Sequence, residues 1–201
     1  MSDEFECPLC GHVGAFQEYR GRANARCPVC RSLERMRHQW LIARDRGLLD
    51  DAASRAVLHV APEPCVAKYL RAFGRYIGFD TDSAREIDIQ GDLCAIALED
   101  ACVDVVWASH VLEHIREVDT AIAEIHRVMK PGGVAVIDFP IVGEKTVLFD
   151  TPGESDHWWG PGVDWYDKYR EVGFTVEVLR AADAPKRFRC GGGEVAWCVK
   201  S

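Results

Sequence analysis

Short apolar runs alternate with helix-patterned segments along most of the chain. The runs are rich in β-branched residues, end at turn residues, and have the length of buried parallel strands. We expect four such strands, AVLHVA (56–61), RYIGFD (75–80), VDVVWAS (103–109) and VAVIDFP (134–140). The spacing of apolar residues predicts one helix behind Pro64 and another over 117–129, followed by a KPGG turn. This alternation predicts a parallel sheet with right-handed crossovers.

The end of the chain follows a different pattern. A helix-patterned stretch, DWYDKYREV, leads to Gly173, and two strand-like runs follow it, FTVEVL (174–179) and EVAWCVK (194–200). Strands joined by a loop alone pair in antiparallel fashion, because a parallel pair needs a longer crossover. We therefore expect an α/β fold with a doubly wound, mostly parallel sheet and an antiparallel C-terminal hairpin at one edge.

Two close pairs of cysteines stand near the start of the chain. CPLCG and CPVCR each contain Cys-x2-Cys, with sixteen residues between the pairs. Two residues between thiolates let one turn aim both sulfurs at an ion, and two such turns complete the tetrahedral site that Zn²⁺ accepts. The expected ligands are Cys7, Cys10, Cys27 and Cys30. Cys-Pro-x-Cys turns of this form also resemble those that hold iron in rubredoxins. Zinc remains the favoured metal, because nothing else in the chain indicates electron transfer. The alternative is two unrelated cysteine pairs.

A linking helix is expected after the second cysteine pair. Its apolar residues recur at helical spacing, at Leu33, Met36, Trp40 and Ala43. Ser32 is placed to cap this helix and Gly47 to end it. We therefore divide the chain into a zinc ribbon (1–31), a linking helix (32–50) and a main domain (51–201).

Composition limits the size and setting of the protein. A chain of 201 residues that is 48% hydrophobic can bury one substantial core and carry a small extra module. The sequence has no apolar run of the ~20 residues that a membrane span needs, and MSDEFECPLC lacks the pattern of a signal peptide. Nine cysteines, an odd number that includes two tight pairs, favour a reducing compartment. We expect a cytoplasmic protein with no membrane partner.

The charge of the chain is unevenly distributed. The net charge is −8, and residues 1–50 carry eight basic against seven acidic side chains, so the acidic excess lies in the rest. An acidic main domain disfavours nucleic acid as a partner. An arginine cluster near the ribbon could still contact nucleic acid, although such a run is more often a solvated face: Arg20, Arg22, Arg26, Arg31, Arg35 and Arg37.

The segment VDVVWASHVLEHI, followed by AIAEIHRVMKPGGVAVIDFP, resembles the fourth strand, helix and fifth strand of class I S-adenosylmethionine-dependent methyltransferases. The resemblance extends over about 55–200 and implies a Rossmann-like sheet that binds S-adenosylmethionine. Between RYIGFD and the later GDL there is no space for the helix that the family usually has there. The chain therefore resembles a shortened member of the family.

The resemblance implies a set of cofactor-binding residues at the ends of successive strands, where a doubly wound sheet binds its ligand. Asp80 would accept hydrogen bonds from the ribose diol, with Asp82 as the alternative if the register shifts. Asp92 and the backbone of Leu93 would lie beside the adenine. The residues that would line the methionine end are Ser109 and His110.

The loop after the first strand departs from the family pattern. The family has an acidic residue and then alternate glycines, where this chain has His59, Ala61, Glu63 and Cys65. S-adenosylmethionine has no phosphate to cradle, which weakens the need for glycine. We expect Ala61 and Pro62 to line the cofactor and Glu63 to face its cationic end, or else to cap the helix that follows. The alternative is a decayed site.

Methyl transfer is an in-line displacement, and a base helps only when the acceptor is a hydroxyl or a protonated amine. The candidates for such a base are His110, His114 and His157, of which His110 and His157 are preferred, because His114 and Glu113 lie at a helix start and fit packing or capping roles. His157 lies in GESDHWWGPGVDW, whose aromatic residues suit an apolar or ring-bearing acceptor. The sequence thus predicts methyl transfer to a small-molecule acceptor, and leaves the oligomeric state open. The alternative is a non-catalytic zinc-ribbon adaptor on a decayed methyltransferase fold.

Overall fold

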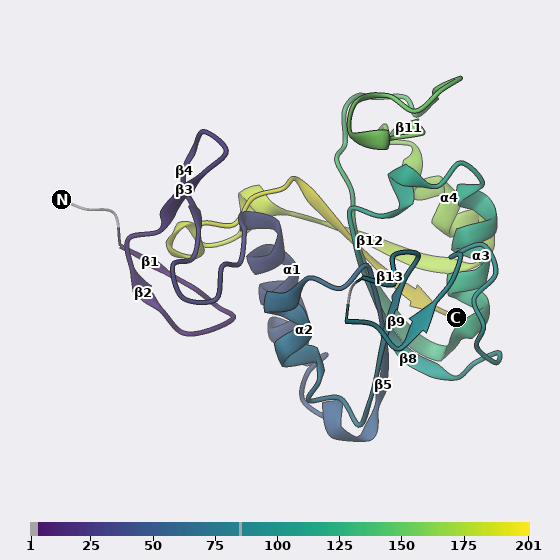
Figure 1. Cartoon of the computed structure of the whole chain (residues 1–201), viewed down its shortest axis with the longest axis horizontal. Helices are drawn as coiled ribbons and strands as arrows, with labels where there is room; N and C mark the ends of the chain where they lie inside the picture. Colours follow the sequence, from purple (N-terminus) through teal and green to yellow (C-terminus); the bar gives the residue numbers. More distant parts are fainter. Residues whose placement is uncertain (1–3, 85) are drawn as a thin grey trace.

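A seven-stranded sheet forms the centre of the molecule (Figure 1). The structure is a computed structural model that describes residues 4–84 and 86–201. The strands are β5 (Ala56–Val60), β6 (Arg75–Asp80), β7 (Ile89–Gln90), β8 (Val103–Ser109), β9 (Met129–Asp138), β12 (Phe174–Arg180) and β13 (Glu194–Lys200). Their order is β12-β13-β9-β8-β5-β6-β7, and only the pairings of β13 are antiparallel. This confirms the predicted fold class. The short edge strand β7 was not predicted.

Helices cover both faces of the sheet. They are α1 (Glu34–Asp45) and α2 (Pro64–Leu70) on one face, and α3 (Val118–Val128) and α4 (Trp165–Val172) on the other. Successive side chains of a strand point to opposite faces. In β8, Val105 and Trp107 accordingly pack with the first pair of helices, and Val106 and Ala108 with the second. Single-turn helices are η1 (Ala52–Ser54), η2 (Leu112–His114), η3 (Glu154–Asp156), η4 (Ala181–Asp183) and η5 (Lys186–Phe188).

The KPGG segment lies within β9 as a bulge. Val103 pairs with Met129, but Val105 pairs with Val134, so the intervening residues have no counterparts in β8. Gly132 has φ 74°, a left-handed conformation that glycine adopts without a steric penalty. The predicted turn is therefore present, but the strand begins before it and continues after it.

Residues 4–31 form two small hairpins beside the main body, at the purple end of the chain (Figure 1). They pair β1 (Phe5–Glu6) with β2 (Val13–Gly14) and β3 (Gln17–Tyr19) with β4 (Arg22–Arg26). The prediction that Ser32 caps α1 was wrong, because Leu33 occupies the N-cap position. The Ser32 hydroxyl instead accepts a hydrogen bond from Cys30 Sγ at 3.2 Å and lies 3.4 Å from Cys7 Sγ.

A buried arginine joins this N-terminal module to the body. The side chain of Arg37, in α1, is fully buried. Its guanidinium donates hydrogen bonds of 2.7–3.1 Å to four backbone carbonyls, those of Ala25, Ser32, Phe188 and Arg189. It thereby links β4, the start of α1 and the loop before β13. The interpretation of Arg37 as part of a solvated face was therefore wrong.

No helix in the described ranges combines the length and the apolar composition that crossing a bilayer requires.

Replacing Arg37 with methionine should destabilise the fold strongly, because four buried carbonyls would lose a charged donor. We expect Arg37→Met to lower the free energy of unfolding in urea by about 3 kcal/mol. The matched control is Arg46→Met at the end of the same helix, where a partly exposed Arg46–Glu177 ion pair of 2.6 Å contributes under about 1 kcal/mol. Equal losses in the two variants would contradict this account of Arg37.

Candidate functional site

The sulfurs of the four predicted metal ligands come together in the N-terminal module. The Sγ atoms of Cys7, Cys10, Cys27 and Cys30 all lie within 4.8 Å of one another. The Cys7–Cys30 and Cys10–Cys27 separations are 3.5 and 3.6 Å. A tetrahedral zinc site with Zn–S bonds of ~2.3 Å places its sulfurs ~3.8 Å apart. The arrangement therefore fits one tetrahedral metal ion.

The loop after β5 adopts a glycine-like turn without glycine. Ala61 has φ 48°, and its N–H donates to the carbonyl of Phe79 at 2.8 Å. Left-handed backbone costs an L-residue about 1 kcal/mol or more, which indicates that the surrounding contacts impose this turn. Glu63 then occupies the N-cap position of α2, but its side chain makes no capping hydrogen bond. The capping role considered for the Glu63 carboxylate is therefore not supported by the geometry.

Glu63 instead lies between two basic side chains. Its Oε1 is 3.5 Å from Arg35 Nη2, and its Oε2 is 3.6 Å from Nε2 of the buried His59. Arg35 also donates from Nε to Ser109 Oγ at 3.2 Å. This arginine of α1 therefore reaches both the loop that follows β5 and the last residue of β8. Sequence reasoning missed its role, because 28 residues separate it from Glu63 and 74 from Ser109.

The acidic residues predicted for the ribose and the adenine follow β6 and β7. Asp80 ends β6, and its Oδ1 accepts a hydrogen bond of 3.1 Å from the N–H of Asp82. Asp82 and Asp92 are exposed, and each carboxylate accepts from the backbone N–H two residues further on. Leu93, next to Asp92, is buried in the core. All of these residues except the buried Leu93 side chain could be reached by a ligand at this edge.

A cluster of titratable groups stands at the ends of β8 and β9. His110 has φ 51°, and its Nδ1 lies 3.1 Å from Glu113 Oε1. Its Nε2 lies 4.0 Å from Asp138 Oδ2. Ser109 and Asp138 are buried, whereas 30% of the His110 side chain is exposed. His110 is thus positioned between two buried carboxylates and solvent.

The surroundings shift the titration of this cluster. Burial lowers the pKa of His110, but the adjacent Glu113 and Asp138 carboxylates raise it by more, so that it lies above its ordinary value. Burial raises the pKa of Asp138 to about 6, although the imidazole of His110 acts against that increase. A buried carboxyl with this pKa can exchange protons near neutral pH.

His157 lies in the segment that follows β9. This segment contains a hairpin that was not predicted, β10 (Val147–Leu148) with β11 (Trp159–Gly160). The ring of His157 packs against that of His114, with centroids 4.6 Å apart and planes at 84°. The structure thus brings His157 to Glu113 and His114, the two residues that sequence analysis assigned to packing or capping.

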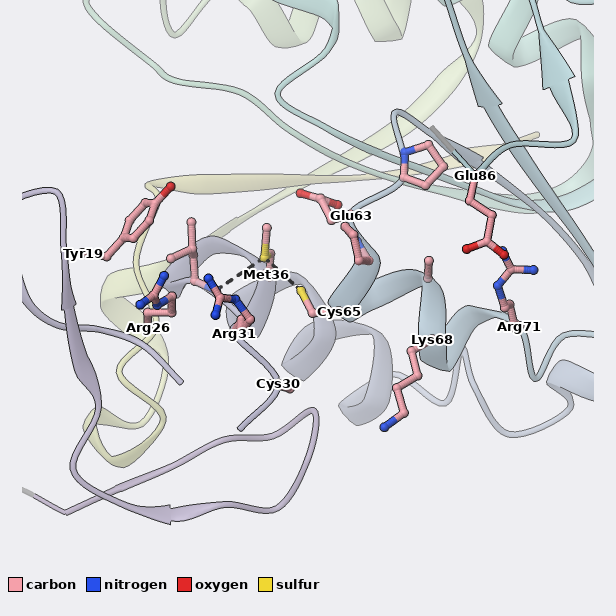
Figure 2. A pocket seen from close by; sticks show the side chains of 14 residues that line it. Tyr19, Arg26, Cys30, Arg31, Met36, Glu63, Cys65, Lys68, Arg71 and Glu86 are labelled. Carbon is pink, nitrogen blue, oxygen red and sulfur yellow. Dashed lines mark hydrogen bonds and ion pairs between the residues drawn. The ribbon is translucent and has the colours of Figure 1, made fainter. Parts of the chain in front are cut away.

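A cavity of about 820 Å³ lies between the N-terminal module and α2. Figure 2 shows Tyr19 and Arg26 on one side of it, and on the other Lys68 of α2 and Arg71, which follows that helix. The loop after β5 contributes Pro62 and Glu63 to the lining of this cavity. The residues at the ends of β8 and β9, Ser109, His110 and Asp138, do not line it.

A family model matches the central segment of the chain. Residues 54–137 match the family model described as a methyltransferase domain. The matched residues include β5, β6, β8 and nearly all of β9, the strands whose carboxyl ends carry the candidate site.

Curated relatives match part of this chain over part of their own length. A probable S-adenosylmethionine-dependent methyltransferase of Mycolicibacterium smegmatis is 37% identical over 76 residues, which are 33% of this chain and 30% of that protein. An uncharacterized 37.1 kDa protein in transposon TN4556 of Streptomyces fradiae is 31% identical over 88 residues, or 37% of this chain and 26% of that protein. The chain thus spans less than a third of the length of these two relatives.

Solved structures of methyltransferases share the fold. An S-adenosylmethionine-dependent methyltransferase from Mesorhizobium loti superposes with a TM-score of 0.60 at 12% identity, over 81% of this chain and 97% of that chain. A second one, from Archaeoglobus fulgidus, gives a TM-score of 0.56 at 17% identity, over 81% and 94%. At these identities the likeness shows a shared fold and nothing more.

The raised pKa of Asp138 predicts a pH-dependent stability of this site. The unfolded chain releases this proton near the ordinary value of 3.8, and the folded protein only near 6. Stability from this group is therefore complete below the lower value and is lost as pH rises through the upper one. Asp138→Asn removes the titration, and His110, Glu63 and Arg35 are the charged neighbours that remain.

Urea unfolding at pH 4.5 and pH 7 would measure the effect. The Asp138→Asn variant should become more stable relative to the parent as the pH rises from 4.5 to 7. The difference between the unfolding free energies of the two proteins should change by about 2 kcal/mol, at 1.36 kcal/mol for each pKa unit. A difference between the two proteins that is the same at both pH values would show that Asp138 titrates normally.

Proposed function

We propose that the chain transfers a methyl group from S-adenosylmethionine to a small-molecule acceptor at the carboxyl ends of β5, β6, β8 and β9. The observation that carries the proposal is the Arg35–Glu63 pair, in which Arg35 joins the loop after β5 to the end of β8. The amino-acid end of S-adenosylmethionine is a zwitterion. A guanidinium suits its carboxylate, and a carboxylate suits its ammonium group. The methyltransferase-domain match of residues 54–137 supports methyl transfer from this donor.

The other cofactor contacts follow from the order of the strands. Asp80, at the end of β6, is placed to accept the hydrogen bonds of a ribose diol. Asp92 and the backbone of Leu93 would contact the adenine beyond β7. Ala61 and Pro62 would approach the sugar closely, because the Ala61 turn exposes backbone and only a methyl side chain. Ser109 would lie at the methionine end, beside Arg35.

His110 is the group best placed to serve the acceptor. Its imidazole lies between the Glu113 and Asp138 carboxylates, which stabilise its protonated form. It can take the proton that an acceptor hydroxyl or ammonium releases as the methyl group leaves the sulfonium, with S-adenosylhomocysteine as the second product. The exposed part of the ring can then return the proton to solvent. A small-molecule acceptor agrees with the acidic main domain, whose charge disfavours nucleic acid.

The N-terminal module would support this site through a structural zinc ion. Residues 1–31 would form the zinc ribbon, 32–50 the link and 51–201 the catalytic domain. Four thiolate ligands leave no position open for substrate, which is typical of structural rather than catalytic zinc. The ion would hold the hairpins that surround Arg37, because a segment of this length has too small an apolar core of its own.

Calorimetric titration with S-adenosylmethionine and S-adenosylhomocysteine tests the proposal. Asp80→Ala should weaken both affinities by roughly 10- to 100-fold, the effect of losing a charge-assisted hydrogen bond. Asp82→Ala tests the alternative register, and its affinities should stay within about threefold of the parent because Asp82 lies two residues beyond the end of β6. Weaker binding in Asp82→Ala alone would assign the ribose contact to Asp82. If the parent binds neither ligand, the non-catalytic adaptor hypothesis takes the place of this one.

A further inference from the structure

A buried carboxylate beside the proposed catalytic histidine lacks the hydrogen bonds that burial normally requires. The side chain of Glu113, in η2, is fully buried. Neither oxygen accepts a well-aligned hydrogen bond from a described residue, although Oε1 lies 3.1 Å from His110 Nδ1. An ionised carboxylate in such a place is costly unless a cation or several donors compensate it. His110 lies close to Oε1 only, so Oε2 of Glu113 could still bind a cation.

Two imidazoles stand next to this carboxylate. One ligand atom each from Glu113, His114 and His157 lies within 4.8 Å of the other two. His114 Nδ1 is 3.3 Å from the carbonyl oxygen of Asp156. Because a carbonyl can only accept, this contact places the proton on Nδ1 and leaves the lone pair of Nε2 free for a cation. A backbone carbonyl on the second nitrogen is the usual partner of a metal-bound histidine.

The backbone holds the segment of His157 in this position. The N–H of Trp158 donates to the carbonyl of Glu113 at 2.9 Å, and the indole N–H of Trp159 donates to the carbonyl of Ile115 at 2.8 Å. The two residues that follow His157 are therefore fixed to η2 and its end. The three side chains form a prearranged group contributed by two distant parts of the chain.

We propose that Glu113, His114 and His157 bind one divalent transition-metal cation, separate from the metal of the four-cysteine ribbon. Two imidazole nitrogens and one carboxylate oxygen are a donor set that suits Fe²⁺, Co²⁺, Ni²⁺ or Zn²⁺ and leaves coordination positions open. Thiolates, in contrast, make the ribbon selective for softer ions. Metal binding at this second site does not depend on the proposed methyl transfer.

The location of the site suggests what the open positions bind. Glu113 contacts His110, which lies at the end of β8 next to Asp138. A ligand bound to the cation would therefore lie on the acceptor side of the cofactor site. The cation would hold an acceptor that has a hydroxyl or carboxylate oxygen, and fix its orientation toward the methyl donor. This role, unlike the metal binding, rests on the proposed function.

Titration of the zinc-loaded protein with Co²⁺, followed by calorimetry and elemental analysis, tests the metal site. The parent should bind close to one additional equivalent while its ribbon zinc stays in place. His157→Ala and Glu113→Gln should each weaken this binding at least tenfold. The matched control is His126→Ala, which replaces a half-buried histidine on α3 outside the cluster and should bind as the parent does.

Two outcomes would overturn the metal site: no additional equivalent in the parent, or equal Co²⁺ affinity in the parent and in His157→Ala. The His157→Ala variant is needed because His157 is only partly buried. Its replacement therefore tests metal binding even if Glu113→Gln fails to fold. Binding of S-adenosylmethionine is measured separately in the same proteins. Bound Co²⁺ without S-adenosylmethionine binding would refute the proposed function and leave the metal site standing.

Discussion

The buried guanidinium of Arg37 is the interaction on which the arrangement of the two parts of the chain depends. A fully buried arginine is tolerated only when its donors are satisfied, and here four carbonyls from three segments accept them. Side chains two positions apart on a helix point in different directions. Arg37 therefore faces the N-terminal module, while Arg35 on the same helix reaches Glu63 and Ser109. Helix α1 is thus shared by the ribbon and the candidate cofactor site.

The candidate site itself combines residues that the fold brings to one edge of the sheet. Two of them adopt backbone conformations that most residues avoid, Ala61 at φ 48° and His110 at φ 51°. Such strain persists only where surrounding contacts impose it, and it is concentrated at functional sites. The strained residues follow β5 and β8, the two central strands between which a doubly wound sheet opens its crevice. The sheet topology and the strained backbone therefore both point to the carboxyl ends of β5 and β8 as the location of the candidate site.

Local patterns were enough to predict most of the framework. The strands at 75–80, 103–109 and 194–200 were predicted to the residue, because each is a short β-rich run with turn residues on both sides. The clustering of the four cysteine sulfurs was predictable because Cys-x2-Cys is a local geometric unit. β7 was missed because two residues carry no periodicity. The same limit applies to the short hairpin in the segment after β9.

Long-range contacts were beyond what the sequence could provide. Arg35 and Arg37 belong to one arginine run, and nothing in composition indicates that one would be buried and the other would contact Glu63. Likewise, Glu113 and His114 read as ordinary helix-start residues until the fold brings His157, 43 positions after His114, against them. Burial and tertiary contact, not residue type, decide these roles.

The central claim is that α1 transmits the order of the ribbon to the cofactor site. The most direct measurement is a calorimetric titration with S-adenosylmethionine of the parent and of Cys27→Ser, using protein whose far-ultraviolet circular dichroism shows an intact sheet. If the claim is right, the variant loses its ribbon metal and binds S-adenosylmethionine at least tenfold more weakly, because Arg35 is no longer held beside Glu63 and Ser109. A variant that has lost the metal but binds S-adenosylmethionine as tightly as the parent would contradict the claim.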